Sequence, residues 1–233
     1  MTRWTCGSWL ALAVLVSTAA TQAAPGDPAL EFARGLQKKI DTIRDFSADF
    51  THTYTGGVLR KQLTERGRLM VKKPGKMRWE YTTPDKKTFV SDGARLYAYI
   101  PADRQVIVST VPRDGQTTPA LFLAGQGDLV RDFTVSNAPP PQGALAGTRA
   151  LKLVPRTPQP DFETLTLAVD PTTLALRGLE SVDTQGGVSS FLLTNVKENL
   201  GLSDREFTFA MPRGVDVVTD DSTTPRPKNS SGR

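Results

Sequence analysis

Few side chains in this chain could carry out catalysis. His52 is the only histidine among the 233 residues, and it lies in a run of alternating residues without a neighbouring acid or hydroxyl motif. A histidine in the core or lining a cavity is therefore favoured over a general base. Asp85, Asp92 and Asp103 fall in predicted turns, where aspartate is a common turn former. The sequence also lacks a G-x-S-x-G elbow, a P-loop and an H-E-x-x-H zinc motif, which argues against an enzyme.

A hydrolase is the alternative from a different functional class. It would need a reactive nucleophile close to His52. A metal site is not predicted either, because zinc would find one imidazole at most.

The single cysteine, Cys6, lies near the start of a predicted signal peptide that covers residues 1–23. Arg3 precedes an apolar run over residues 9–15, and small residues then lead to a predicted cut after Ala23. The apolar run is too short to span a bilayer permanently. The exported protein would therefore have no cysteine, which excludes disulfides, thiolate catalysis and cysteine metal sites.

The charge of the chain is mildly positive. The formal charge is +5, and removal of Arg3 with the signal peptide lowers it by one to +4. Lysine and arginine are spread among acidic residues, so a solvated surface is favoured over a nucleic-acid-binding stripe.

After the signal peptide, an amphipathic helix is followed by a strand. Asp27 and Pro28 form a typical helix start. Apolar residues then recur at steps of three and four, which predicts a helix that lies on a sheet; they are Ala29, Phe32, Leu36, Ile40 and Ile43. From Phe46 the apolar period changes to two, which predicts a strand over residues 46–55.

The most clearly specified local structure is a β-hairpin with a basic tip, GRLMVKKPGKMRWEY, over residues 67–81. The turn lies at residues 72–75. Met77, Trp79 and Tyr81 share one face of its second strand, whereas Arg78 and Glu80 point to the other face.

The rest of the chain predicts a meander of short strands, about eleven in total. Residues 95–100 are apolar on both faces, which predicts a strand covered on both sides. One domain over residues 24–218 and a disordered polar tail over residues 219–233 are expected. The further strands are predicted over residues 62–72, 76–82, 87–91, 105–111, 129–135, 149–154, 164–170, 174–181, 188–197 and 206–209.

A short apolar helix is predicted to start at Pro119 and to end at Gly125. Because it is apolar all round, it must be buried either in the core or across the mouth of a cavity. Apolar residues on the predicted strands are numerous enough to line a curved sheet, either solid or enclosing a ligand cavity; they are Phe50, Met77, Trp79, Phe89, Leu96, Phe191, Leu193, Phe207 and Phe209.

The order of elements resembles the periplasmic outer-membrane lipoprotein carrier family, LolA, over residues 30–218. The similar features are the helix running into FSADFTHTY, the hairpin GRLMVKKPGKMRWEY, the segment FVSDGARLYAYIP, the helix TPALFLAG and the closing FTFAMPRGVDVV. The resemblance implies a mainly β fold, an incomplete antiparallel β-barrel of about eleven strands. The N-terminal helix and a short lid helix would cover an apolar cavity for lipoprotein acyl chains.

The resemblance also implies partners and site residues. Cargo would come from an inner-membrane ABC exporter and pass to an outer-membrane receptor, so a monomeric carrier would bind neither ATP nor another cofactor. Lys73, followed by Pro74, occupies the hairpin position where well-known members have an arginine involved in accepting cargo. The expected cavity residues are Phe50, Met77, Trp79, Phe89, Leu121, Phe122, Leu123 and Phe191.

Relatives of this fold give the alternatives within the same class. A carrier or sensor of another lipid or hydrophobic ligand could use the same scaffold. An outer-membrane receptor is disfavoured because the lipid-acceptor cysteine is missing, and a stress sensor usually carries a second domain.

Overall fold

The structure, a computed structural model, describes residues 27–58, 61–111, 119–125 and 127–220. These residues form one twelve-stranded sheet with the strand order β12-β6-β5-β4-β3-β2-β1-β11-β10-β9-β8-β7. The strands are β1 (Asp45–Thr55), β2 (Gln62–Lys72), β3 (Lys76–Thr83), β4 (Lys87–Asp92), β5 (Arg95–Ile100), β6 (Gln105–Thr110), β7 (Phe133–Ala138), β8 (Arg149–Pro155), β9 (Thr164–Val169), β10 (Leu176–Val182), β11 (Val188–Glu198) and β12 (Asp216–Asp220).

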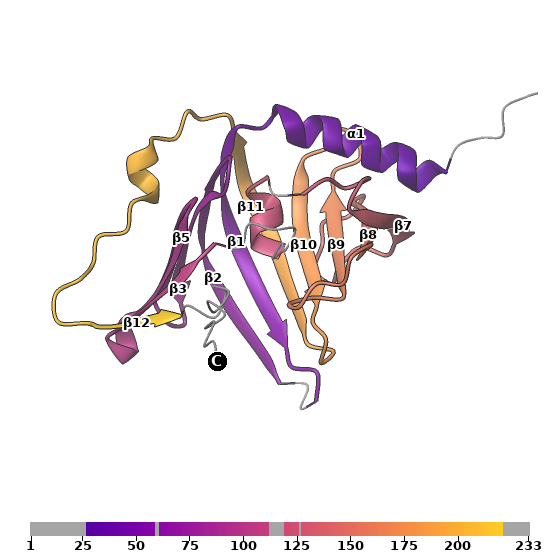
Figure 1. Cartoon of the computed structure of the whole chain (residues 1–233). Coiled ribbons are helices and arrows are strands. Elements are labelled where there is room, and N and C mark those ends of the chain that lie inside the picture. Colours follow the sequence, from indigo (N-terminus) through magenta and orange to yellow (C-terminus); the bar gives the residue numbers. More distant parts are fainter. Residues whose placement is uncertain (1–26, 59–60, 112–118, 126, 221–233) are drawn as a thin grey trace, which may run out of the picture.

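The sheet curves without closing into a barrel, and β12 and β7 are its two end strands. All neighbouring strands pair antiparallel except β12, which pairs parallel with β6. The helices α1 (Pro28–Thr42) and α2 (Pro119–Leu123) lie on the concave side (Figure 1). The predicted mainly β, incomplete barrel with two covering helices is thereby confirmed.

Helix α1 begins as the sequence predicts. The Asp27 carboxylate accepts a hydrogen bond from the Ala29 N–H at 2.8 Å, and Pro28 occupies the first helical position. The helix buries Ala29, Ala33 and Leu36 against the sheet. Small alanine side chains let the helix backbone approach the strands closely. Figure 1 shows α1 lying across one end of the sheet, from β11 toward β7.

Polar side chains hold α1 near both of its ends. The Arg149 guanidinium lies 4.1 Å from the centre of the Phe32 ring and donates to the Pro28 carbonyl at 2.9 Å. Near the other end, Lys39 forms an ion pair with Glu198 of β11. The position of α1 across the sheet is therefore fixed by charged contacts as well as by burial.

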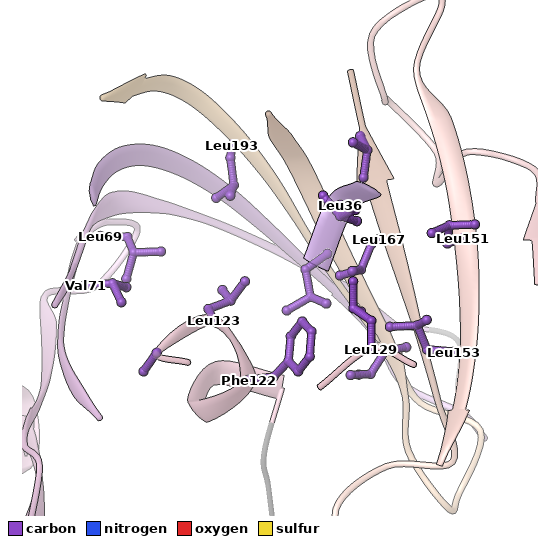
Figure 2. Close-up of a cluster of buried hydrophobic side chains, with 14 of the residues drawn as sticks. Leu36, Leu69, Val71, Phe122, Leu123, Leu129, Leu151, Leu153, Leu167 and Leu193 are labelled. Atoms are coloured by element: carbon purple, nitrogen blue, oxygen red, sulfur yellow. The ribbon is translucent and has the colours of Figure 1, made fainter. Parts of the chain in front are cut away.

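The core fills the space between the concave face and the two helices. Figure 2 shows Leu36 of α1 and the α2 side chains of Phe122 and Leu123 directed toward leucines of the sheet. The buried apolar residues of the sheet include Leu69, Val71, Leu151, Leu153, Leu165, Leu167, Leu179 and Leu193.

The structure corrects two of the predicted strands and adds one that was not predicted. Residues 204–207 form a 3-10 helix, Asp204–Phe207, where a strand over 206–209 is predicted. Strand β7 begins at Phe133, later than predicted, because Asp128 and Asp132 accept backbone hydrogen bonds in a turn just before it. Strand β12 is missing from the predictions and extends the ordered domain to residue 220, beyond the expected boundary at 218. Residues 1–23 and 221–233 lie outside the described residues.

Strand β5 is predicted to be covered on both sides, and the connection between β11 and β12 covers its outer face. The ring of Phe209 stacks on Tyr97, with ring centres 5.2 Å apart, and meets Tyr99 edge to face at 6.2 Å. These two tyrosines point away from the concave face, since Leu96 on the other side of the strand packs against the core. The connection therefore covers part of the outer face.

The start of that connection is fastened by Asp45, which is 5 % exposed. Its carboxylate oxygens accept hydrogen bonds from three successive backbone N–H groups, those of Leu200 at 2.6 Å, Gly201 at 3.1 Å and Leu202 at 3.3 Å. The three donors would be left without an acceptor if the carboxylate were removed.

We therefore expect Asp45→Ala to lower the free energy of unfolding by about 2–3 kcal/mol. Asp49→Ala on the same strand is the matched control, because Asp49 is exposed and bonds only the Asn195 side chain in the described residues. Urea unfolding followed by circular dichroism measures both values. Equal losses in the two variants would contradict this role of Asp45.

Candidate functional site

Aromatic and methionine side chains gather on the concave face where β1 and β3 approach each other across β2. Phe50, Met77 and Trp79 are 3 %, 3 % and 6 % exposed. The Phe50 ring meets Trp79 edge to face at 5.2 Å, and the Trp79 indole N–H donates to Met77 Sδ at 3.4 Å. The Phe50 ring lies over Gly67 of β2, where an added methyl group would stand 2.7 Å from it. The missing side chain at this glycine lets the two aromatic rings meet.

Phe191 and Phe89 extend this group on either side. The centre of the Phe191 ring lies 5.1 Å from that of Trp79 and 6.0 Å from that of Phe50. Phe89 contacts Tyr81, 5.7 Å away between ring centres. The structure thus brings five of the residues predicted from the sequence into one aromatic cluster: Phe50, Met77, Trp79, Phe89 and Phe191.

Helix α2 lies over the sheet and supplies the next predicted residues. Phe122 and Leu123 are 5 % and 7 % exposed, and the Phe122 ring meets Phe133 of β7 edge to face at 5.8 Å. The side chain of Leu121 lies outside the described residues. The side chains of Phe122 and Leu123 thus point inward, as Figure 2 shows.

A small cavity of about 50 Å³ lies between the two helices and the sheet. Among the described residues, Lys73 and Glu198 are the only charged ones that line it, and Phe122 and Leu123 are the predicted residues that do so. Its other lining residues are Ile40, Ile43, Phe46, Leu167, Leu176, Leu193 and Val196. The aromatic cluster does not line this cavity and packs beside it in the core.

Lys73 turns inward from the hairpin tip and contacts both helices. Its ammonium group donates to the Ile40 carbonyl of α1 at 2.6 Å. A methyl group added at Gly125, just after α2, would stand 2.7 Å from Lys73 Cδ. Burial lowers the pKa of Lys73, and the nearby Asp41 carboxylate opposes this shift.

The neighbouring residues of the tip complete the junction. The Gly75 N–H donates to the Ala124 carbonyl at 3.1 Å, and the Lys73 N–H donates to the Arg44 carbonyl at 2.9 Å. Pro74 is exposed at the tip. The predicted basic tip is therefore where the sheet, α1 and α2 meet, and its lysine is part of that junction.

His52 has polar partners that the sequence analysis missed. Its Nε2 lies 2.7 Å from Ser189 Oγ of β11, and its Nδ1 lies 3.3 Å from Glu65 Oε2 of β2. The ring also stacks on Phe191, with centres 4.1 Å apart. Burial lowers the pKa of His52, and the Glu65 carboxylate partly opposes this effect.

The described residues contain neither a metal-binding cluster nor a membrane-spanning helix. Within the described residues, no group of three or more histidine, cysteine, aspartate or glutamate side chains could hold a metal ion. Across those same ranges, no helix combines the length and apolar character required to cross a membrane.

The comparisons agree on one family. The model of the family "Outer membrane lipoprotein carrier protein LolA" matches residues 41–210. The outer-membrane lipoprotein carrier protein of Bordetella avium is 32% identical over 82% of this chain and 90% of its own length. That of Methylococcus capsulatus is 30% identical over 79% of this chain and 86% of its own.

Solved structures are more distant in sequence. A LolA superfamily protein from Nitrosomonas europaea is 15% identical and covers 76% of this chain and 97% of its own, with a TM-score of 0.42. The family model and the curated relatives span most of the chain, including the hairpin and the aromatic cluster. This chain therefore belongs to the LolA family of outer-membrane lipoprotein carrier proteins.

Proposed function

We propose that this protein is a periplasmic carrier that holds the acyl chains of lipoproteins on its concave face while they pass from the inner to the outer membrane. The observation that carries the proposal is α2, a short helix whose described side chains pack onto an apolar sheet. Burial stabilises an acyl chain by about 0.8 kcal/mol per methylene, so such chains need shielding in an aqueous compartment. The relatives named as lipoprotein carriers support the same function.

Loading requires α2 to move, because the closed cavity is too small. A volume of about 50 Å³ has room for roughly three to five water molecules, far less than an acyl chain needs. Moving α2 away would uncover the aromatic cluster and the cavity wall together. The acyl chains would then lie against Phe50, Met77, Trp79, Phe89 and Phe191, with residues 121–123 covering them.

The hairpin tip is suited to control this movement. Lys73 and Gly75 fasten the two helices by single hydrogen bonds. The neutral bond from Gly75 contributes about 1 kcal/mol and the bond from the Lys73 ammonium about 1.5–3 kcal/mol. A partner that docks at the exposed Pro74 could therefore release the lid at low cost. We assign this docking to an inner-membrane ABC exporter that loads the monomeric carrier and to an outer-membrane receptor that unloads it.

Carriage requires no covalent chemistry, so we propose no enzymatic activity. Ser189, His52 and Glu65 do form a hydrogen-bonded chain that a hydrolase could use. However, Ser189 lies inside the regular ladder between β1 and β11, whereas a nucleophilic serine of the α/β-hydrolase type lies on a sharp, exposed turn. The alternative function within the same class, a carrier of another lipid, would use the same concave face for a different cargo.

The role of α2 as a lid is tested at Leu123. We expect Leu123→Glu to abolish release of newly made lipoproteins from spheroplasts, because the charged group cannot be buried over the acyl chains. Lipoprotein recovered with the purified carrier in the supernatant measures this release.

The matched control is Leu145→Glu, since Leu145 is 60 % exposed on a surface loop. Circular dichroism establishes that both variants fold. Undiminished release by a folded Leu123→Glu variant would remove α2 from the proposed mechanism.

Movement of the lid is tested by a reversible tether between Lys73 and Gly125. A methyl group at Gly125 would stand 2.9 Å from Lys73 Cγ, so cysteines at these two positions are close enough to form a disulfide. We expect the oxidised Lys73→Cys/Gly125→Cys variant to take up no lipoprotein and the reduced form to recover uptake. A side chain at Gly125 is strained because φ there is +84°. This strain is the same in the oxidised and the reduced variant, so it does not affect the comparison between them. Uptake by the fully oxidised protein would show that the lid need not open.

A further inference from the structure

A row of polar side chains crosses the concave face beyond the aromatic cluster. Five adjacent strands contribute one residue each: Ser189 from β11, His52 from β1, Glu65 from β2, Tyr81 from β3 and Lys87 from β4. His52 lies opposite Glu65 in the β1–β2 ladder, and Tyr81 lies opposite Lys87 in the β3–β4 ladder. We call these five residues the polar row.

The members of the polar row are connected through one buried carboxylate. The side chain of Glu65 is 5 % exposed, and its Oε1 accepts from Lys87 Nζ at 2.5 Å. Its other oxygen faces His52 Nδ1 at 3.3 Å, and His52 Nε2 in turn faces Ser189 Oγ at 2.7 Å. Lys87 Nζ also lies 5.4 Å from the centre of the Tyr81 ring. Both oxygens of the only carboxylate in the row are therefore engaged.

The polar row contains hydrogen-bond donors that have no partner among the described residues. An ammonium group has three N–H donors, and Lys87 directs one of them to Glu65. The Tyr81 hydroxyl has no hydrogen-bond partner among the described residues. Burial, with a smaller effect from the Glu65 charge, raises the pKa of Tyr81, so its hydroxyl keeps its proton and remains a donor. The group that would complete the row is an acceptor.

The absence of net charge in the polar row favours a neutral acceptor over an anion. Lys87 and Glu65 cancel each other, and His52, whose pKa is lowered by burial, is neutral at pH 7. An anion would gain little from a row without net charge, and its desolvation would be costly. A neutral carbonyl oxygen, by contrast, accepts hydrogen bonds without this cost.

The distance along β1 is comparable with the length of an acyl chain. Phe46 lines the cavity under α1, and His52 follows six residues later on the same face of the strand. At about 3.3 Å per residue this separation is about 20 Å. One leaflet of a bilayer, which is one acyl chain deep, contributes about 15 Å of hydrocarbon. A chain that starts in the cavity would therefore bring its carbonyl end to the polar row.

We infer that the polar row is a binding site for the ester or amide carbonyl groups at the head of the cargo's acyl chains. This inference rests on the proposed carrier function and specifies which part of the lipid is recognised besides its hydrocarbon. The row orients the lipid, with the hydrocarbon toward α1 and the carbonyls at the end of the concave face remote from α1.

Two synthetic lipopeptides that differ only in their linkages test the site. One has ester-linked palmitoyl chains, and the other has ether-linked hexadecyl chains, which lack the carbonyl oxygens. Affinities for the purified mature protein are measured by calorimetry at pH 7. We expect the wild-type protein to prefer the ester by about 5- to 10-fold, the effect of one or two neutral hydrogen bonds.

Tyr81→Phe removes one donor and keeps the ring. We expect it to reduce the preference for the ester and to leave affinity for the ether unchanged. The matched control is Tyr97→Phe, since Tyr97 stacks on Phe209 on the outer face. Lys87→Gln removes the surplus ammonium donors while retaining a donor for Glu65, and combined with Tyr81→Phe it should abolish the preference.

Each contrary outcome has a separate meaning. Equal affinity of the wild-type protein for ester and ether would overturn the carbonyl site and leave the carrier function standing. Failure of both lipopeptides to bind would count against the carrier function itself. Release of palmitate by the wild-type protein, lost in His52→Ala, would replace the binding site with a hydrolytic one.

Discussion

The junction between the hairpin tip and the two helices is the constraint on which the closed structure depends. Its central contacts are single hydrogen bonds, from Lys73 Nζ to the Ile40 carbonyl and from the Gly75 N–H to the Ala124 carbonyl. Helix α2 has only five residues, too few to be stable by itself. It is therefore held by its apolar contacts with the sheet and by this junction. Burial of the Lys73 ammonium, which lowers its pKa, reduces the stability of the closed arrangement.

A carrier must release its cargo, and apolar burial alone gives no direction to transfer. A methylene group gains about 0.8 kcal/mol whether it leaves water for a bilayer or for a protein cavity. In this structure, Phe122 and Leu123 pack onto the concave face. Cargo must displace contacts that the protein already makes with itself, which lowers its net affinity. Lid closure thereby protects the empty carrier from exposing an apolar surface and also favours release.

Local patterns were sufficient to predict most of the fold. The period-two alternation predicted β1, and the Pro-Gly turn between two amphipathic segments predicted β2 and β3. Strand β12 was missed because its segment is short, is followed by a polar tail and pairs parallel with β6. Parallel pairing is a non-local interaction that no neighbouring turn specifies. The helix Asp204–Phe207 was missed because Phe207 and Phe209, at its end and just beyond it, alternate in the way that is typical of a strand.

Part of the candidate site could also be predicted from the sequence, and part could not. The aromatic cluster could be predicted because Met77 and Trp79 alternate along one strand and so must share a face. The partners of His52 could not be predicted, since Glu65 is 13 residues away along the chain and Ser189 is 137 residues away. Only strand order and register bring these residues together. For the same reason, the inward direction of Lys73 depends on α1 and α2, and the hairpin sequence contains no information about their position.

The concave face changes in polarity along the strands, and this gradient distinguishes it from a uniformly apolar core. Near α1 the wall of the cavity is almost entirely apolar, the middle is aromatic, and the remote end carries the polar row. An apolar pocket binds a hydrocarbon chain in either direction, because dispersion and burial have no orientation. Hydrogen-bond donors at one end remove that freedom. If the polar row binds carbonyl groups, the polypeptide of a bound lipoprotein must emerge at that end, away from the junction that controls the lid.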